Sequence, residues 1–268
     1  MNIKINILIA GLLAGALSCT IEEYTQEAAN IPVIQAFLTP GQLPEVSLTR
    51  IIPYAAESGD TVAVPLSGLS VSLTVNGNEF VLTEDSAGSG TYVPVDPAFM
   101  VKAGDTILFK TDYMGVPVTA STVVPSPVAS LSMTDDALFY SSGSPQSWLS
   151  AGEIDLTWHN PEESFYYITV ENIEDDPTPL NEMAENMPKF GSSPPSRGNE
   201  FRIGMRNVTY FGTHRVIVYH VNSEFAELFD NPGMSSVSMA EPPTNINNGL
   251  GIFTSMNTDT VYFKVYKQ

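Results

Sequence analysis

The chain has 268 residues, and its 30 Asp and Glu against 11 Lys and Arg give a formal net charge of −19. A surface this acidic repels nucleic acids and anionic headgroups, so neither is an expected partner. A hydrophobic content of 43% excludes a disordered chain, and 20 prolines with 19 glycines are typical of an all-β protein rich in turns.

Residues 1–18 have the organisation of a secretory signal peptide: Lys4 gives a positive start, and an apolar run over residues 5–17 follows. This run is shorter than the roughly 20 residues that span a bilayer. Residues 16–19 (ALSC) resemble a bacterial lipobox, which implies cleavage before Cys19, the single cysteine, and its acylation by fatty acids such as palmitate. The alternative is an ordinary secreted protein with a chance cysteine near the cleavage site.

Residues 19–31 are predicted to form the lipidated cysteine and an acidic tether. Fully extended, the polar stretch 20–30 (TIEEYTQEAAN) reaches roughly 35–40 Å. Glu22 and Glu23 resemble the acidic signal that directs Bacteroidota lipoproteins to the outer face of the outer membrane; the alternative is a solvated linker without an address. We therefore expect a lipid anchor in the outer membrane, facing the cell exterior, with the periplasmic face as the alternative.

Residues 32–126 predict an N-terminal β-sandwich of about seven short strands. The expected strands are 33–38, 45–50, 69–75, 79–82, 91–93, 106–110 and 116–124. The pair Asn76-Gly77 is the strongest short hairpin signal among them. The order of residues 90–92 (GTY) and 103–105 (AGD) resembles transthyretin-like or carboxypeptidase-regulatory-like domains, which are binding or spacer modules.

A second β-sandwich is predicted over residues 127–268, after the proline-rich boundary 125–127. Its expected strands are 153–159, 166–170, 201–210, 214–221, 249–253 and 260–266. The first two resemble a fibronectin/Ig-like sandwich. One short helix is expected at about 223–230, near the C-terminus. The long loop 173–200 shows no strand-like alternation, and a loop of this length is functional or disordered.

Taken together, the order of segments resembles a family of Bacteroidota lipoproteins known as domain of unknown function 4249. The resemblance rests on the lipoprotein start and on residues 33–39, 48–50, 123–127, 219–225 and 245–253. Members of this family often accompany TonB-dependent outer-membrane transporters, so the resemblance implies an accessory role in uptake at the cell surface. It implies no catalytic residue and no cofactor.

The three histidines are expected to be surface or edge residues and not metal ligands. His214 and His220 fall on one face of a predicted strand but about 20 Å apart, too far to share an ion. His159 falls on the polar side of its strand. The acidic run 174–176 lacks the alternating spacing of a calcium loop. No metal site is therefore predicted.

Charge is distributed unevenly along the second unit. Residues 153–185 contain acids and no Lys or Arg, whereas Lys189, Arg197, Arg202, Arg206 and Arg215 follow closely. One hypothesis is a partner-binding or anion-binding edge formed by Arg197, Arg202 and Arg206, with the last two on one face of the strand 201–210. The alternative is charge complementarity between neighbouring strands.

Four segments resemble the O-glycosylation acceptor of exported Bacteroidota proteins, with Thr61, Ser86, Thr106 and Thr260 as acceptors. The alternative is that Asp ends a turn and Thr begins a strand.

The sequence supports no nucleophilic catalysis, since it has no Gly-x-Ser-x-Gly elbow and the single thiol is expected to be acylated. We therefore expect a non-enzymatic lipoprotein accessory to a TonB-dependent transporter, acting by ligand capture or docking. The alternatives are a cell-surface adhesion or structural module that binds protein or glycan, and a degradative enzyme.

Overall fold

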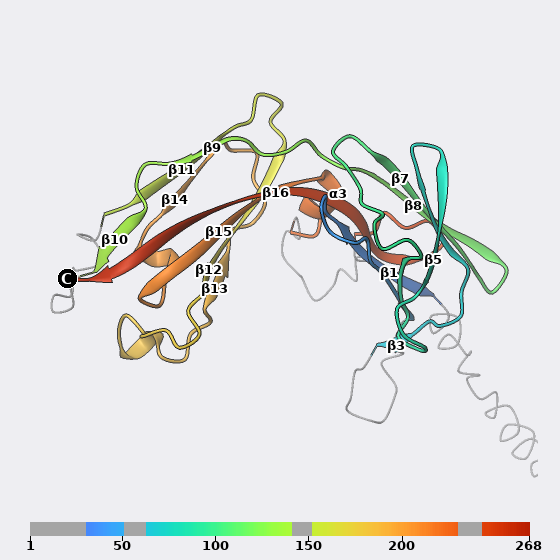
Figure 1. The fold of residues 1–268 in the computed structure, drawn as a ribbon, viewed down its shortest axis with the longest axis horizontal. Coiled ribbons are helices and arrows are strands. Elements are labelled where there is room, and N and C mark those ends of the chain that lie inside the picture. Colours follow the sequence, from blue (N-terminus) through green and yellow to red (C-terminus); the bar gives the residue numbers. More distant parts are fainter. Residues whose placement is uncertain (1–30, 51–62, 141–151, 230–242) are drawn as a thin grey trace, which may run out of the picture.

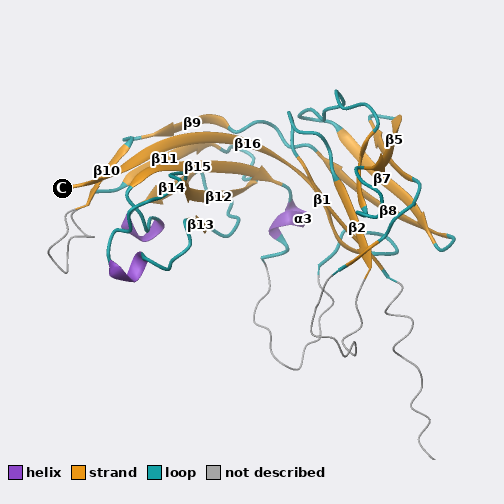
Figure 2. Cartoon of the chain, turned by 60° about the horizontal axis from the view of Figure 1, so that its bottom comes forward, coloured by secondary structure: helices purple, strands orange, loops and turns teal. Residues whose placement is uncertain are grey.

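The computed structural model describes residues 31–50, 63–140, 152–229 and 243–268. These residues form an all-β protein of two β-sandwich units, which lie end to end along the long axis of the molecule (Figure 1). The predicted fold class is therefore confirmed, and the described residues include the expected short α-helix, α3 (Ser223–Ala226). Seen from the side, the two units form an arch, with α3 beneath their junction (Figure 2).

The first unit is one long sheet that folds over its own core. Its order is β1-β2-β6-β5-β4-β7-β8, with β3 paired to β2. The strands are β1 (Pro32–Leu38), β2 (Val46–Arg50), β3 (Val64–Pro65), β4 (Val71–Val75), β5 (Asn78–Glu84), β6 (Thr91–Pro94), β7 (Thr106–Tyr113) and β8 (Val116–Val123). Alternating residues such as Ile34, Leu48, Leu73 and Phe109 point inward and are fully buried. This arrangement follows from the period-two pattern of the strands.

The hairpin predicted at Asn76-Gly77 joins β4 to β5, and Val75 pairs with Asn78. Both turn residues have positive φ, 49° and 86°, as a two-residue hairpin turn requires.

The second unit is a sandwich of two sheets. One contains β13, β12, β15, β16 and β10, and the other has the order β14-β11-β9. The strands are β9 (Ala129–Met133), β10 (Ala137–Tyr140), β11 (Ile154–His159), β12 (Phe165–Asn172), β13 (Phe190–Ser192), β14 (Glu200–Ile203), β15 (Gly212–Val221) and β16 (Leu250–Lys267). Leu156, Trp158, Ile168 and Val218 belong to the core between the sheets.

The last strand, β16, belongs to both units and crosses the junction (Figure 1). Its residues 250–255 pair in parallel with β1, and residues 256–265 pair antiparallel with β15. The sequence assigned all of 127–268 to the second unit and split this region into two strands. The structure corrects both points, because residues 252–257 continue the strand and are buried on both faces, which hides any alternation.

Two predicted segments of the second unit also differ from expectation. The predicted strand 201–210 ends at Ile203, and a 3-10 turn, η3 (Met205–Asn207), follows. The long loop 173–200 contains the 3-10 turn η2 (Glu182–Ala184) and the edge strand β13.

The described part of the chain includes no helix with the length and apolar character to cross a membrane.

Candidate functional site

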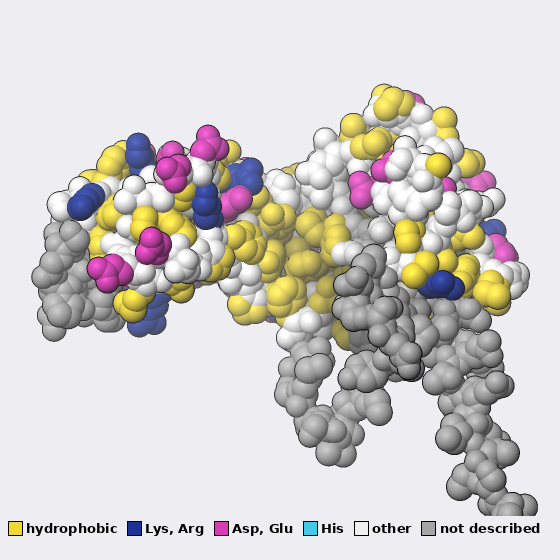
Figure 3. Space-filling model, turned by 90° about the horizontal axis from the view of Figure 1, so that it is seen from below, with side chains coloured by type: hydrophobic (Ala, Val, Ile, Leu, Met, Phe, Trp, Pro, Cys, Tyr) yellow, Lys and Arg dark blue, Asp and Glu magenta, His cyan; other side chains and the backbone are white. Residues whose placement is uncertain are grey.

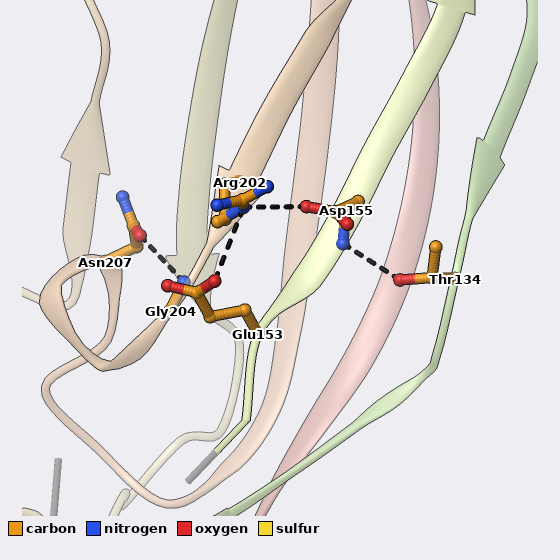
Figure 4. Close-up of polar contacts among 6 residues, drawn as sticks. All are labelled: Thr134, Glu153, Asp155, Arg202, Gly204 and Asn207. Carbon is orange, nitrogen blue, oxygen red and sulfur yellow. Dashed lines mark hydrogen bonds and ion pairs between the residues drawn. The ribbon is translucent and has the colours of Figure 1, made fainter. Parts of the chain in front are cut away.

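Arg202 forms ion pairs with the neighbouring strand. It lies on β14 directly opposite Asp155 of β11, and its Nε is 2.8 Å from Asp155 Oδ1 and 3.4 Å from Glu153 Oε2 (Figure 4). The hydrogen bond and the charge of Asp155 raise the pKa of the Arg202 guanidinium. All three side chains are largely exposed, so the pairs contribute little to stability. For Arg202, the contacts are those of charge complementarity between adjacent strands.

Arg206 is on the η3 turn and not on the strand with Arg202, because the strand ends before Gly204. The Gly204 N–H donates to Asn207 Oδ1 at 3.0 Å and closes this turn (Figure 4). The turn still brings Arg206 and Arg202 to one open surface depression, which Glu153 also lines. The two arginines therefore meet by a different backbone path from the predicted one.

Arg197 is held against β12 instead. Its guanidinium carbon lies 4.1 Å from the centre of the Phe165 ring, a cation–π contact. Its Nη1 donates to the Glu163 carbonyl oxygen at 3.0 Å. The structure thus brings together two of the three predicted arginines and places the third in a separate contact.

His214 and His220 are buried, which contradicts the prediction of surface or edge histidines. His214 stacks on Phe263 with ring centres 4.9 Å apart, and its Nδ1 is 3.1 Å from the Gly212 carbonyl oxygen. Burial lowers the pKa of the His214 imidazole, against an opposing contribution from the Gly212 carbonyl. Both histidines alternate with buried valines on β15, so the period-two pattern did contain the signal.

His220 fixes the linker between the units. Its Nδ1 is 2.8 Å from the Ser126 carbonyl oxygen, and its ring stacks on Tyr166 at 4.8 Å. His159 is exposed at the end of β11, as predicted. The described residues include no group of three or more His, Cys, Asp or Glu side chains arranged to hold a metal ion.

The predicted modification sites are dispersed. Cys19 and Thr61 lie outside the described residues. Ser86 is exposed in the loop after β5, and Thr106 is exposed at the start of β7. Thr260 is half-buried within β16, where its N–H donates to Asp259 Oδ1 at 2.7 Å.

A polar network at the junction was not predicted. Asn222 Nδ2 donates to Thr122 Oγ1 and to the Val123 carbonyl oxygen, each at 3.0 Å, and to the Ser255 carbonyl oxygen at 3.2 Å. The Thr122 hydroxyl donates to Glu224 Oε1 at 3.0 Å. These bonds join β8 of the first unit to the end of β15, to α3 and to β16.

An aromatic cluster lies beside this network. We use this name for Phe37, Tyr167, Tyr219, Phe225 and Phe229, whose contacting rings have centres 5.4–6.2 Å apart. Phe37 is 39% exposed and Phe229 is 46% exposed. Seen from below, hydrophobic side chains gather between the two units (Figure 3). The spacing of Phe225 and Phe229 was the one visible signal, since residues four apart share a helix face.

A family model described as "Domain of unknown function (DUF4249)" matches residues 20–261. The chain belongs to the DUF4249 family. No curated protein matches the sequence. Among solved structures, the chain is similar to the crystal structure of the FN1–FN3 domains of chicken CNTN1, with 14% identity and a TM-score of 0.24. The match covers 88% of this chain and 66% of that one, so the chain spans slightly less than two thirds of that structure.

The structure gives a physical reason for two of the segments that resemble DUF4249. Residues 219–225 supply part of the aromatic cluster and the junction network. Residues 245–253 form a clasp, in which the Asn245 amide donates to the Phe253 carbonyl oxygen at 2.6 Å and accepts from its N–H at 2.9 Å. In this DUF4249 protein, the first segment lies where the units join, and the second packs on the first unit, where Ile246 and Phe253 belong to its core.

Proposed function

We propose that this DUF4249 protein is a lipid-anchored, non-enzymatic lipoprotein of the outer membrane that faces the cell exterior. Its proposed role is accessory to a TonB-dependent outer-membrane transporter, by docking on it or by capturing a ligand for it. The observation that carries the proposal is the order of the chain: a signal-like start, Cys19, an acidic tether and a folded body that begins at β1. The choice of a TonB-dependent transporter as the partner rests on the family resemblance alone.

The tether sets how the body meets a membrane partner. Between Cys19 and the start of β1 at Pro32, an extended chain reaches about 40 Å. Several acyl chains make attachment effectively permanent, whereas one chain is marginal. A body held this close to the membrane meets a partner in the same membrane at high effective concentration. Even modest contacts then suffice for association.

The aromatic cluster is the surface we propose for docking. Tyr and Phe are enriched at the centres of protein–protein interfaces, where they supply large contact areas. Phe37 and Phe229 remain exposed at the cluster, and grouped exposed apolar side chains mark interaction sites. The junction network beneath fixes the two units that contribute these residues, so the surface is preorganised.

Co-purification from native membranes tests this function. The acylated protein is captured from detergent-solubilised outer membranes, and the associated proteins are identified by mass spectrometry. A TonB-dependent transporter should be retained by the parent protein and lost with Phe229→Ser. Phe139→Ser is the matched control, since Phe139 is 45% exposed but lies on β10, and it should retain the transporter.

Other outcomes would contradict the transporter role. Surface display without any transporter would favour the adhesion module, and turnover of a glycan by the purified protein would favour the degradative enzyme. Equal loss of the transporter with Phe229→Ser and Phe139→Ser would contradict docking through the aromatic cluster.

A further inference from the structure

The second unit contains a cavity of about 230 Å³ that opens between the edges of its two sheets. One side is formed by β12 and β13, and the other by the end of β14 and η3. The cavity reaches the core, where the buried side chains of Ile168, Val170 and Val208 line it. A volume below the roughly 300–1,000 Å³ of drug-sized pockets suits a small ligand.

Ser193, one of the residues that line the cavity, has a side-chain hydroxyl without a partner among the described residues. Ser193 Oγ is buried, and no hydrogen bond to it is formed within the described residues. The Ser193 backbone N–H, in contrast, donates to the Ile168 carbonyl oxygen at 2.9 Å. A buried hydroxyl without a hydrogen bond costs free energy, so native proteins rarely keep one without a reason. A ligand with a hydrogen-bond acceptor would satisfy it.

The cavity is lined by two cationic side chains beside neutral polar ones and His214, although the whole chain is acidic. Lys189 and Arg206 line it, and no Asp or Glu is among its described lining residues. Lys189 Nζ donates to the backbone carbonyl oxygens of Glu174 and Asp175 at 3.1 and 3.0 Å. These neutral groups position the ammonium without cancelling its charge. The chain has only 11 Lys and Arg, so two at one cavity favour an anion.

We propose that this cavity binds a small amphipathic carboxylate. The apolar part of the ligand enters between the sheets against Ile168, Val170 and Val208. The carboxylate meets the positive charges of Lys189 and Arg206 and accepts a hydrogen bond from Ser193 Oγ. This inference deepens the ligand-capture role and rests on the proposed function for its biological meaning, but the binding itself requires no transporter.

Calorimetry on the unacylated mature chain, residues 19–268 with Cys19→Ala, tests the cavity without detergent. The probes are octanoate, octanamide and octylamine, which share a chain length and differ in charge. Octanoate should bind with a dissociation constant below about 1 mM. Octanamide should bind at least about tenfold more weakly, because it lacks the charge-assisted contacts, and octylamine should not bind.

Variants then locate the site. Lys189→Met should weaken octanoate binding about tenfold, and Ser193→Ala should weaken it a few-fold without loss of thermal stability. Arg202→Gln is the control, because Arg202 does not line the cavity, and its affinity should match the parent. Equal affinity for octanoate and octanamide, no octanoate binding, or equal effects of Arg202→Gln and Lys189→Met would overturn the proposal.

The comparison of octanoate, octanamide and octylamine uses the parent protein, so its result does not depend on whether a variant folds. The near-ultraviolet circular dichroism of each variant shows whether its tertiary packing is intact. If the parent protein does not bind octanoate but a transporter still co-purifies, the ligand site is contradicted and the transporter role is not. If the parent protein binds octanoate but no transporter co-purifies, the transporter role is contradicted and the ligand site is not.

Discussion

The Asn222 side-chain amide donates to the Val123 carbonyl oxygen at 3.0 Å, which ties the start of α3 in the second unit to the end of β8 in the first. The same nitrogen contacts Thr122 Oγ1 and the Ser255 carbonyl oxygen. One amide therefore satisfies groups from both units, and the side chain makes no capping bond to its own helix. The units are fixed to each other by this residue and by the shared strand β16.

Asn222→Ala should lower the free energy of unfolding by about 1–3 kcal/mol, because it removes the hydrogen bonds that join Thr122, Val123 and Ser255 to one amide. Urea denaturation measures the loss. Ser223→Ala, an exposed neighbour, is the control and should change the free energy by no more than about 0.5 kcal/mol. Equal effects of the two variants would show that the junction network does not stabilise the protein.

Gly251 is required where β16 passes β1. Its φ is 101°, and a Cβ added there would overlap the Ile34 carbonyl oxygen. Gly251→Ala should therefore cost about 3 kcal/mol or more, measured by thermal or urea unfolding. Gly77→Ala has a similar φ of 86° with nothing near the added Cβ, and should cost only about 1 kcal/mol. Similar costs at the two positions would contradict the close approach of these strands.

His214 should make stability depend on pH near neutrality. Its pKa is lowered by burial, so the folded state holds fewer protons than the unfolded state below the unfolded value of 6.5. The free energy of unfolding is therefore not reduced by His214 above about pH 6.5. It decreases as the pH falls from there towards the folded pKa, because the unfolded state binds the proton first.

The unfolding free energy measured between about pH 7.5 and pH 5.5 should therefore fall, and His214→Gln should flatten this part of the profile. His159→Gln, at an exposed site, serves as the control and should leave the slope unchanged. A profile for His214→Gln that is as steep as the parent profile would show that another group causes the slope.

Local signals predicted the strands of the first unit well, apart from β3, because alternation and turn chemistry act over a few residues. The Asn76-Gly77 turn gave the β4–β5 hairpin and its register. The path of β16 was not predictable in this way, since the pairing of residue 33 with residue 250 is a long-range contact that no local pattern specifies. The burial of residues 252–257 on both faces removed the alternation that would have marked one continuous strand.

The candidate sites were harder to predict from the sequence than the strands. Arg202 and Arg206 do approach one surface depression, but through η3 and not through a shared strand face. The Ser193 hydroxyl and the cavity behind it come from the loop 173–200, whose path the sequence left open. The aromatic cluster combines β1, β12, β15 and α3, so only its Phe225–Phe229 part was visible locally.

Anchoring through Cys19 is the claim on which the proposed function depends most. The most direct measurement is fractionation of cells that express the parent protein or Cys19→Ala, with intact mass measured on each product. The parent should be found with the outer membrane at the mass of an acylated chain that begins at Cys19, and the variant should be released from membranes without acyl mass. A Cys19→Ala protein that fractionates with membranes as the parent does would contradict the lipid anchor.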